Sequence, residues 1–173
     1  AHLHGQPWAL PVQQPGNASL LARAAGAGPK EGLGADEGYD GGESLTSDDD
    51  MQMVWNDEFE GEEEVDQDKW NLVDKGGGFG NNELQFYSNR KENAYLKDGS
   101  LFIVAKKEEH EGSQYTSAKL ESKEQWTYGK MTVRSRSGEA KAKGTWGAHW
   151  MLPRESSHGG WPDGGEIDIM EFV

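Results

Sequence analysis

Short runs of alternating apolar and polar residues, separated by glycine-containing turns, occupy residues 51–173. This alternation has the period of two expected for β-strands with one buried face, and frequent turn signals are typical of a β-sandwich. The run at 130–136 places Met131 and Val133 on one face. The run at 101–105 is apolar throughout, as in a strand covered on both faces. The sequence therefore predicts an all-β domain over residues 51–173.

Residues 1–50 differ in composition from this domain. They are dominated by Ala, Gly, Ser, Pro and Asp, and they carry 2 basic and 8 acidic residues, a net charge of −6. No apolar periodicity is sustained through them, and no signal peptide is recognisable. We expect residues 1–50 to be a disordered, acidic, low-complexity leader.

The charge of the whole chain limits the partners that it can bind. A net charge of −14 repels nucleic acid and anionic membrane surfaces, and no run of 18 apolar residues is present to span a membrane. A neutral sugar meets no such repulsion. With no cysteine in the chain, disulfides and cysteine-based metal sites are excluded.

Seven tryptophans offer flat faces of the kind that stack on sugar rings. On a strand over 144–151, Trp146 and Trp150 share one side and form a plausible sugar platform; on a helix, the same spacing would mark a core face. The flanking glycines favour a strand. We assign Trp55, Trp70 and Trp126 to packing.

Three acidic residues occur within six positions of the segment 165–172. On a strand Glu166 and Asp168 share a face, while Ile167 and Ile169 point into the core. Glu171 lies an odd number of residues from Glu166. On a regular strand it would therefore point to the apolar face as a costly buried charge.

A β-bulge near residues 169–170 resolves this conflict, because one extra residue returns Glu171 to the acidic face and sends Phe172 to the core. Glu166 and Glu171 are then four strand steps apart, roughly 13 Å between their α-carbons. Cleavage of a glycosidic bond with retention needs two carboxyl groups about 5–5.5 Å apart, so both side chains would lean inward. The alternatives from the residues alone are a solvated acidic face and a calcium site.

The segment 166–171 resembles the catalytic signature of glycoside hydrolase family 16, in the bulged form found in its laminarinases. The segments 55–61 and 81–87 resemble the family's opening strand and its Asn-Asn-Glu block. Further similar segments follow in family order at 115–120, 128–130, 150–153 and 161–162. The resemblance covers about residues 53–173.

This resemblance implies that Glu166 is the nucleophile, Glu171 the general acid/base, and Asp168 the helper that tunes their protonation. It also implies that the sugar cleft is lined by five further candidates: Asn81 or Asn82, Arg134, Trp146 and Trp150. For Arg134 a plain surface position is the alternative. Two departures from the family pattern are Gly147 and His149, which stand where proline and phenylalanine are usual.

By the same resemblance we expect a jelly-roll β-sandwich of the concanavalin A-like type and retaining endo-hydrolysis of β-1,3-glucan. A secreted monomer is expected, without a required cofactor but with a possible structural calcium. Alternatives are a mixed-linkage β-1,3-1,4-glucanase and a non-catalytic β-glucan-recognition protein. The sequence ends at Val173, where family members continue, so we expect a C-terminally truncated, partial catalytic domain over residues 51–173, with an inactive fragment as a further alternative.

Overall fold

The computed structural model describes residues 2–3, 16–22, 51–136, 144–155 and 157–171. Nearly all regular structure in these residues is β-strand, which confirms the all-β prediction, and none of them forms a helix long and apolar enough to cross a membrane. A 3₁₀ turn, η2, spans Gly78–Gly80. The strands are β1 (His2–Leu3), β2 (Gly16–Ala22), β3 (Gln52–Asp57), β4 (Trp70–Leu72), β5 (Gln85–Tyr87), β6 (Ala94–Lys97), β7 (Ser100–Ile103), β8 (Lys106–His110), β9 (Ser113–Ser117), β10 (Leu120–Ser122), β11 (Lys130–Ser135), β12 (Thr145–Trp146), β13 (Ala148–Met151) and β14 (Ile167–Glu171).

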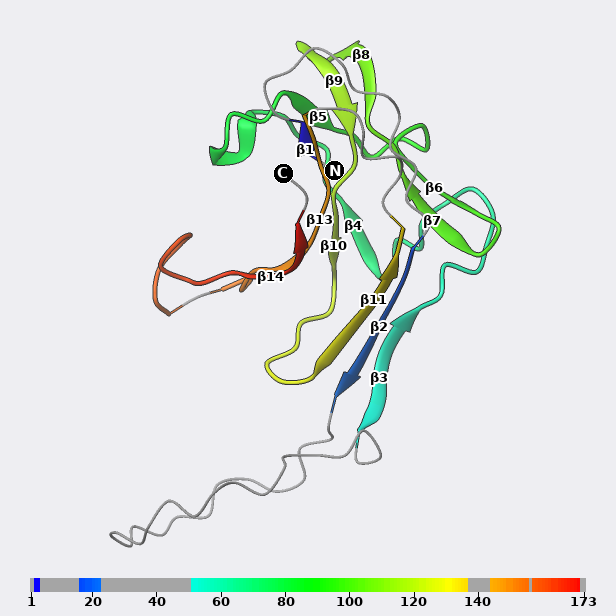
Figure 1. The fold of residues 1–173 in the computed structure, drawn as a ribbon, viewed down its shortest axis with the longest axis vertical. Helices are drawn as coiled ribbons and strands as arrows, with labels where there is room; N and C mark the ends of the chain where they lie inside the picture. Colours follow the sequence, from blue (N-terminus) through cyan, green and yellow to red (C-terminus); the bar gives the residue numbers. More distant parts are fainter. Residues whose placement is uncertain (1, 4–15, 23–50, 137–143, 156, 172–173) are drawn as a thin grey trace, which may run out of the picture.

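The described strands pair into small sheets (Figure 1). Strands β11, β2 and β3 form one antiparallel sheet, and β5, β9 and β8 form another in which β5 and β9 run parallel. The remaining strands form the antiparallel pairs β6–β7, β4–β10, β1–β12 and β13–β14. Sheets of this size present open edges and faces among the described residues.

Strand β2 departs from the expected leader, because residues 16–22 lie between β3 and β11 rather than outside the domain (Figure 1). The backbone groups of β3 and β11 that face this gap need hydrogen-bond partners, and a short segment can supply them without a strong pattern of its own. Residues 2–3 likewise pair with β12. The rest of the predicted leader lies outside the described residues.

The core gathers around buried residues from β6, β7 and the segments beside β3. Trp55, Trp70 and Trp126 pack there as predicted: the Trp55 ring centroid lies 5.3 Å from that of Trp70 and 5.3 Å from that of Trp126. The predicted strand at 101–105 forms only as far as Ile103, although Val104 remains buried beyond the strand end. The buried members of the core cluster are Phe59, Val65, Ala94, Leu96, Leu101 and Ala118.

Asp57 stabilises the turn through which the chain enters this core. Its carboxylate accepts hydrogen bonds from the Trp70 indole N–H at 2.7 Å and from the backbone N–H of Phe59 at 2.9 Å. The Lys69 ammonium lies 3.7 Å away. A buried carboxylate is tolerated because its oxygens are satisfied, and the turn that it closes places Phe59 in the core.

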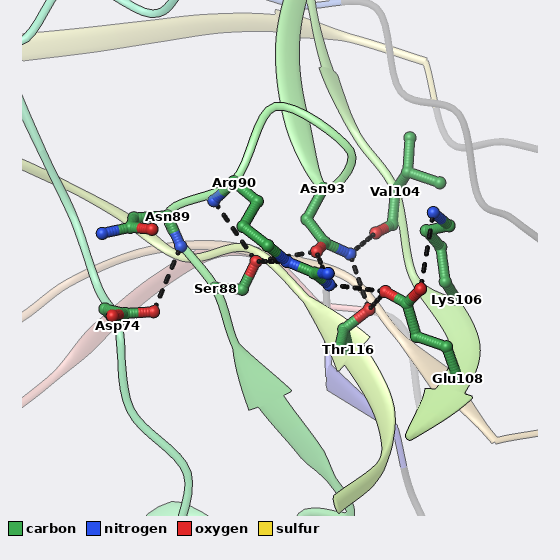
Figure 2. Close-up of polar contacts among 9 residues, drawn as sticks. All are labelled: Asp74, Ser88, Asn89, Arg90, Asn93, Val104, Lys106, Glu108 and Thr116. Atoms are coloured by element: carbon green, nitrogen blue, oxygen red, sulfur yellow. Dashed lines mark hydrogen bonds and ion pairs between the residues drawn. The ribbon is translucent and has the colours of Figure 1, made fainter. Parts of the chain in front are cut away.

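A polar network ties β8 and β9 to the turn that precedes β6 (Figure 2). Buried Asn93 donates to the Val104 carbonyl and to the Thr116 hydroxyl, each at 2.9 Å, and that hydroxyl donates to Glu108 at 2.6 Å. Arg90 bonds to the same carboxylate at 2.5 Å. The Thr116 hydrogen bond, assisted by Arg90 and by Lys106, lowers the pKa of Glu108. The network links the turn before β6 to the paired strands β8 and β9 through side chains.

The predicted core positions on the acidic strand are corrected by the structure. The side chains of Ile167 and Ile169 are 61% and 42% exposed. The reason is that β14 pairs only with β13 among the described strands, and no described element covers this face. Phe172, predicted to join them at the core, lies outside the described residues.

Candidate active site

Strand β14 pairs antiparallel with β13 through an interrupted register. Ala148 lies opposite Glu171, and Trp150 lies opposite Asp168, so Ile169 is the extra residue between the two pairs. This confirms the predicted bulge. Because directly opposed residues share a face of the sheet, Asp168 and Glu171 lie on the face that also carries Ala148 and Trp150.

A pocket of about 200 Å³ opens at this face. Its wall combines aromatic rings with three carboxylates and one ammonium group. The 3₁₀ turn η2, the strands β5, β12, β13 and β14 and the loop between β13 and β14 all contribute to it. The lining residues are Phe79, Asn81, Glu83, Tyr87, Lys119, Trp146, Ala148, Trp150, Leu152, Trp161, Glu166 and Glu171.

Each of the two predicted catalytic glutamates accepts a hydrogen bond from a tryptophan. The Trp146 indole N–H donates to Glu171 at 2.8 Å, and the Trp161 indole N–H donates to Glu166 at 2.5 Å. An indole N–H is a donor only, so it orients a carboxylate without taking its proton. The two carboxylates therefore converge on one pocket with their orientations set by aromatic side chains.

Lys119 is the cation of the pocket. Its ammonium lies 4.8 Å from the centroid of the Trp150 ring and 5.4 Å from that of Phe79, and it pairs with Glu121 at 3.1 Å. Attraction of an ammonium to aromatic faces restricts both partners. Lys119 thus braces the Trp150 ring that was predicted to be a sugar platform.

Glu83 lines the pocket and is only 7% exposed. Its carboxylate accepts hydrogen bonds from the Gln85 amide at 2.6 Å and from the Tyr87 hydroxyl at 3.0 Å. Burial, reinforced by the charge of Glu83, raises the pKa of Tyr87 far above its ordinary value. Tyr87 therefore stays protonated and remains a donor to Glu83.

The structure brings most of the predicted site residues together. Asn81, Trp146, Trp150, Glu166 and Glu171 line the pocket.

Three predicted residues are not among the lining residues. Asp168 lies on the same face without lining the pocket. Asn82, the residue after Asn81, has a left-handed backbone with a φ of 56° and does not line the pocket either. Arg134 lies exposed on β11, which fits the surface alternative left open for it.

Several lining residues were not predicted from the sequence. Lys119, Phe79 and Trp161 come from segments between strands, where strand periodicity gives no orientation. Glu83 carries a signal that was available: with Gln85 and Tyr87 it forms a polar series at every second position, the spacing of one strand face.

The calcium site stays a prediction. Within the ranges that the structure describes, no three histidine or acidic side chains gather closely enough to hold a metal ion. The three carboxylates of the pocket contact tryptophan, tyrosine and glutamine donors instead.

The pocket combines two oriented carboxylates with tryptophan side chains on an all-β fold. This combination is typical of carbohydrate-processing proteins. The family comparison agrees, because the model of the XgeA-like catalytic GH16 domain matches residues 72–173. The chain belongs to glycoside hydrolase family 16.

Individual relatives support this membership. The chain is 46% identical over 127 residues to a β-glucanase of Rhodothermus marinus, which covers 70% of this chain and 44% of the relative. It is 43% identical over 126 residues to a glucan endo-1,3-β-glucosidase of Cryptopygus antarcticus, with 69% and 45% covered.

Among solved structures, the laminarinase from Rhodothermus marinus matches with a TM-score of 0.59 and 41% identity, covering 69% of this chain and 49% of that one. The jelly-roll fold expected from the sequence is thereby confirmed. The chain spans about half the length of the relatives that it matches.

Proposed function

We propose that the protein carrying this chain hydrolyses β-1,3-glucan with retention of configuration, using Glu166 as nucleophile and Glu171 as general acid/base. The observation that carries the proposal is the convergence of both carboxylates on one tryptophan-lined pocket. Two relatives that are glucan endo-1,3-β-glucosidases favour this linkage. An extracellular location accords with a polymeric substrate, and we include it in the proposal.

The chemistry requires two displacements. In the first, a Glu166 oxygen bonds to the anomeric carbon while the glycosidic C–O bond breaks and Glu171 gives its proton to the leaving oxygen. In the second, Glu171 takes a proton from water, whose oxygen displaces Glu166 from the anomeric carbon. The first step needs an ionised Glu166 beside a protonated Glu171, and the indole donors hold both groups in place.

Asp168 acts beside this pair rather than within it. It lies opposite Trp150, on the face of Glu171 and between the two glutamates in sequence, which puts its carboxylate beside the reacting pair. Trp150 and Trp146 supply aromatic faces along the same wall, and Asn81 supplies an amide for sugar hydroxyl groups.

The test is laminarin hydrolysis by the wild-type protein and by the variants Glu166→Gln and Glu171→Gln. Each substitution removes one charge or proton donor while keeping the side-chain shape. We expect Glu171→Gln to lower kcat by about 100- to 10,000-fold, the range that loss of an acid–base group produces, and Glu166→Gln, which removes the nucleophile, to lower it by at least as much.

Glu109→Gln, on β8 away from the pocket, is the matched control and should retain wild-type turnover. Release of reducing ends at the wild-type rate by either pocket variant would disprove the assignment. Binding of laminarin without any release by the wild-type protein would instead support a glucan-recognition function.

A further inference from the structure

We propose that Trp161 is a positioning residue for Glu166 that acts mainly in the second displacement: its indole N–H holds one carboxylate oxygen and stabilises the carboxylate as it leaves the anomeric carbon. The inference rests on the proposed function and deepens it by assigning a residue to one step. It starts from the hydrogen bond of 2.5 Å that the Trp161 indole N–H donates to the Oε2 atom of Glu166. Both residues line the pocket.

A tight turn before β14 brings Trp161 to this oxygen. Two backbone hydrogen bonds of 2.9 and 3.0 Å, donated by the N–H groups of Gly164 and Gly165, close the turn. Trp161 lies near its beginning, and Glu166 follows it five positions later in the chain. The hydrogen bond between indole and carboxylate is therefore made within residues 160–166.

The hydrogen bond distinguishes the two oxygens of the Glu166 carboxylate. Because Trp161 donates to Oε2, the other oxygen, Oε1, is the one left to bond to the anomeric carbon. In the glycosyl-enzyme, Oε1 is then the ester oxygen, and Oε2 is the carbonyl oxygen that faces the indole. An indole N–H donates a hydrogen bond but accepts none, so Trp161 acts on the reaction only through Glu166.

The same hydrogen bond affects the two displacements differently. In the first, it holds Glu166 in place but also stabilises the negative charge that the attack must remove. In the second, the water oxygen bonds to the anomeric carbon, Glu171 takes the water proton, and the electron pair of the bond to Oε1 returns to Glu166. A hydrogen bond to an ionised carboxylate is roughly twice as strong as one between neutral groups. The indole therefore assists the second displacement most.

The exposure of the two side chains limits the size of this effect. Trp161 is 65% exposed in the free protein, and its hydrogen bond to Glu166 is open to water. Water replaces part of a lost donor there, which keeps the loss near that of an ordinary hydrogen bond. We expect removal of the indole N–H to slow the second displacement about five- to tenfold.

The experiment compares the wild-type protein with Trp161→Phe on dinitrophenyl β-laminaribioside. Dinitrophenol leaves readily, so the second displacement limits kcat, while kcat/KM reports the first. We expect Trp161→Phe to lower kcat and KM together by about five- to tenfold and to change kcat/KM by less than about twofold. Below the wild-type KM, mass spectrometry of the quenched reaction should show more of the variant than of the wild type carrying the laminaribiosyl group.

Other roles for Trp161 give different results. Loss of a surface that only stacks on the sugar raises KM and lowers kcat/KM, and a displaced Glu166 lowers kcat/KM at least as much as kcat. Either result for Trp161→Phe would overturn the inference. Trp126→Phe is the matched control, because Trp126 packs against Trp55 and does not line the pocket. It should retain the wild-type kcat and kcat/KM.

Folding and the proposed function are checked separately. Circular dichroism compares the three proteins; if Trp161→Phe does not fold, benzothienylalanine at position 161, which replaces the N–H by sulfur in a ring of the same shape, is measured against the same criteria. A wild-type protein that forms a glycosyl-enzyme, beside a folded variant with unchanged kcat and KM, overturns this inference alone. A wild-type protein that forms no glycosyl-enzyme contradicts the proposed function, and this inference with it.

Discussion

At the scale of single residues, His149 is a buried polar side chain with an unsatisfied ring nitrogen. It lies on β13 opposite Met170, and its Nε2 atom is buried without a hydrogen-bond partner among the described residues. Burial lowers the pKa of His149, because the charged imidazolium is poorly solvated there. As pH falls below about 6.5, the unfolded chain therefore takes up the proton first, and stability decreases.

We predict that His149→Phe raises the unfolding free energy by about 1–2 kcal/mol, because the unsatisfied nitrogen is removed. It should also flatten the loss of stability between pH 7.5 and 5.5. Glu108 adds no pH dependence in that window: its pKa is lowered from 4.5, so its stabilising contribution is fully present there and is lost only at more acidic pH. Thermal unfolding at several pH values checks this, and identical pH profiles for the two proteins would contradict it.

The sequence predicted the role of a residue where the alternation of strand faces fixed the direction of its side chain. Glu171 had to leave the apolar face, and the bulge at Ile169 is how the structure achieves this. Glu83 was missed although Gln85 and Tyr87 repeat its spacing, because a polar face on a strand usually indicates solvent rather than a buried pocket. Lys119 could not be predicted, since its position depends on where the Trp150 ring lies.

At the scale of elements, the start of β14 depends on Gly165. This residue has a φ of 83°, a conformation that side-chain-bearing residues rarely adopt, and it immediately precedes Glu166. Its N–H donates to the Pro162 carbonyl at 3.0 Å, closing the turn that leads into the strand. The turn therefore sets the direction from which Glu166 enters the pocket.

We predict that Gly165→Ala destabilises the protein by about 1–2 kcal/mol through backbone strain and lowers kcat by shifting Glu166. Gly160→Ala is the matched control: Gly160 lies outside the left-handed region, and a methyl group there meets no atom within 4 Å. Thermal unfolding and laminarin turnover are compared for both. Equal effects of the two substitutions would show that the turn does not position Glu166.

The strands themselves were predictable to different degrees. Alternation correctly indicated β11 and placed Trp146 and Trp150 on one side of β12 and β13. It did not indicate β2, because the pairing of residues 16–22 is driven by the open edges of β3 and β11 rather than by a pattern within the segment. Local sequence does not report which distant edge a strand will meet.

At the scale of the whole molecule, exposed apolar side chains mark the faces that the described residues leave uncovered. Met53 and Val54 on β3 and Ile167 and Ile169 on β14 are all substantially exposed, in a chain that spans about half the length of its relatives. The pocket wall that we propose to be catalytic nevertheless lies within this half, since Glu166, Glu171 and their tryptophan partners all belong to it.

The central claim, a two-glutamate retaining mechanism in this pocket, is tested most directly by the configuration of the first-formed product. Proton NMR of laminarin hydrolysis follows the anomeric signals of the new reducing end before mutarotation mixes them. Two displacements occur at the anomeric carbon, the first by Glu166 and the second by water. Each inverts the configuration, so the β-anomer is predicted to appear first. Initial formation of the α-anomer would contradict the account, because it requires a single displacement by water.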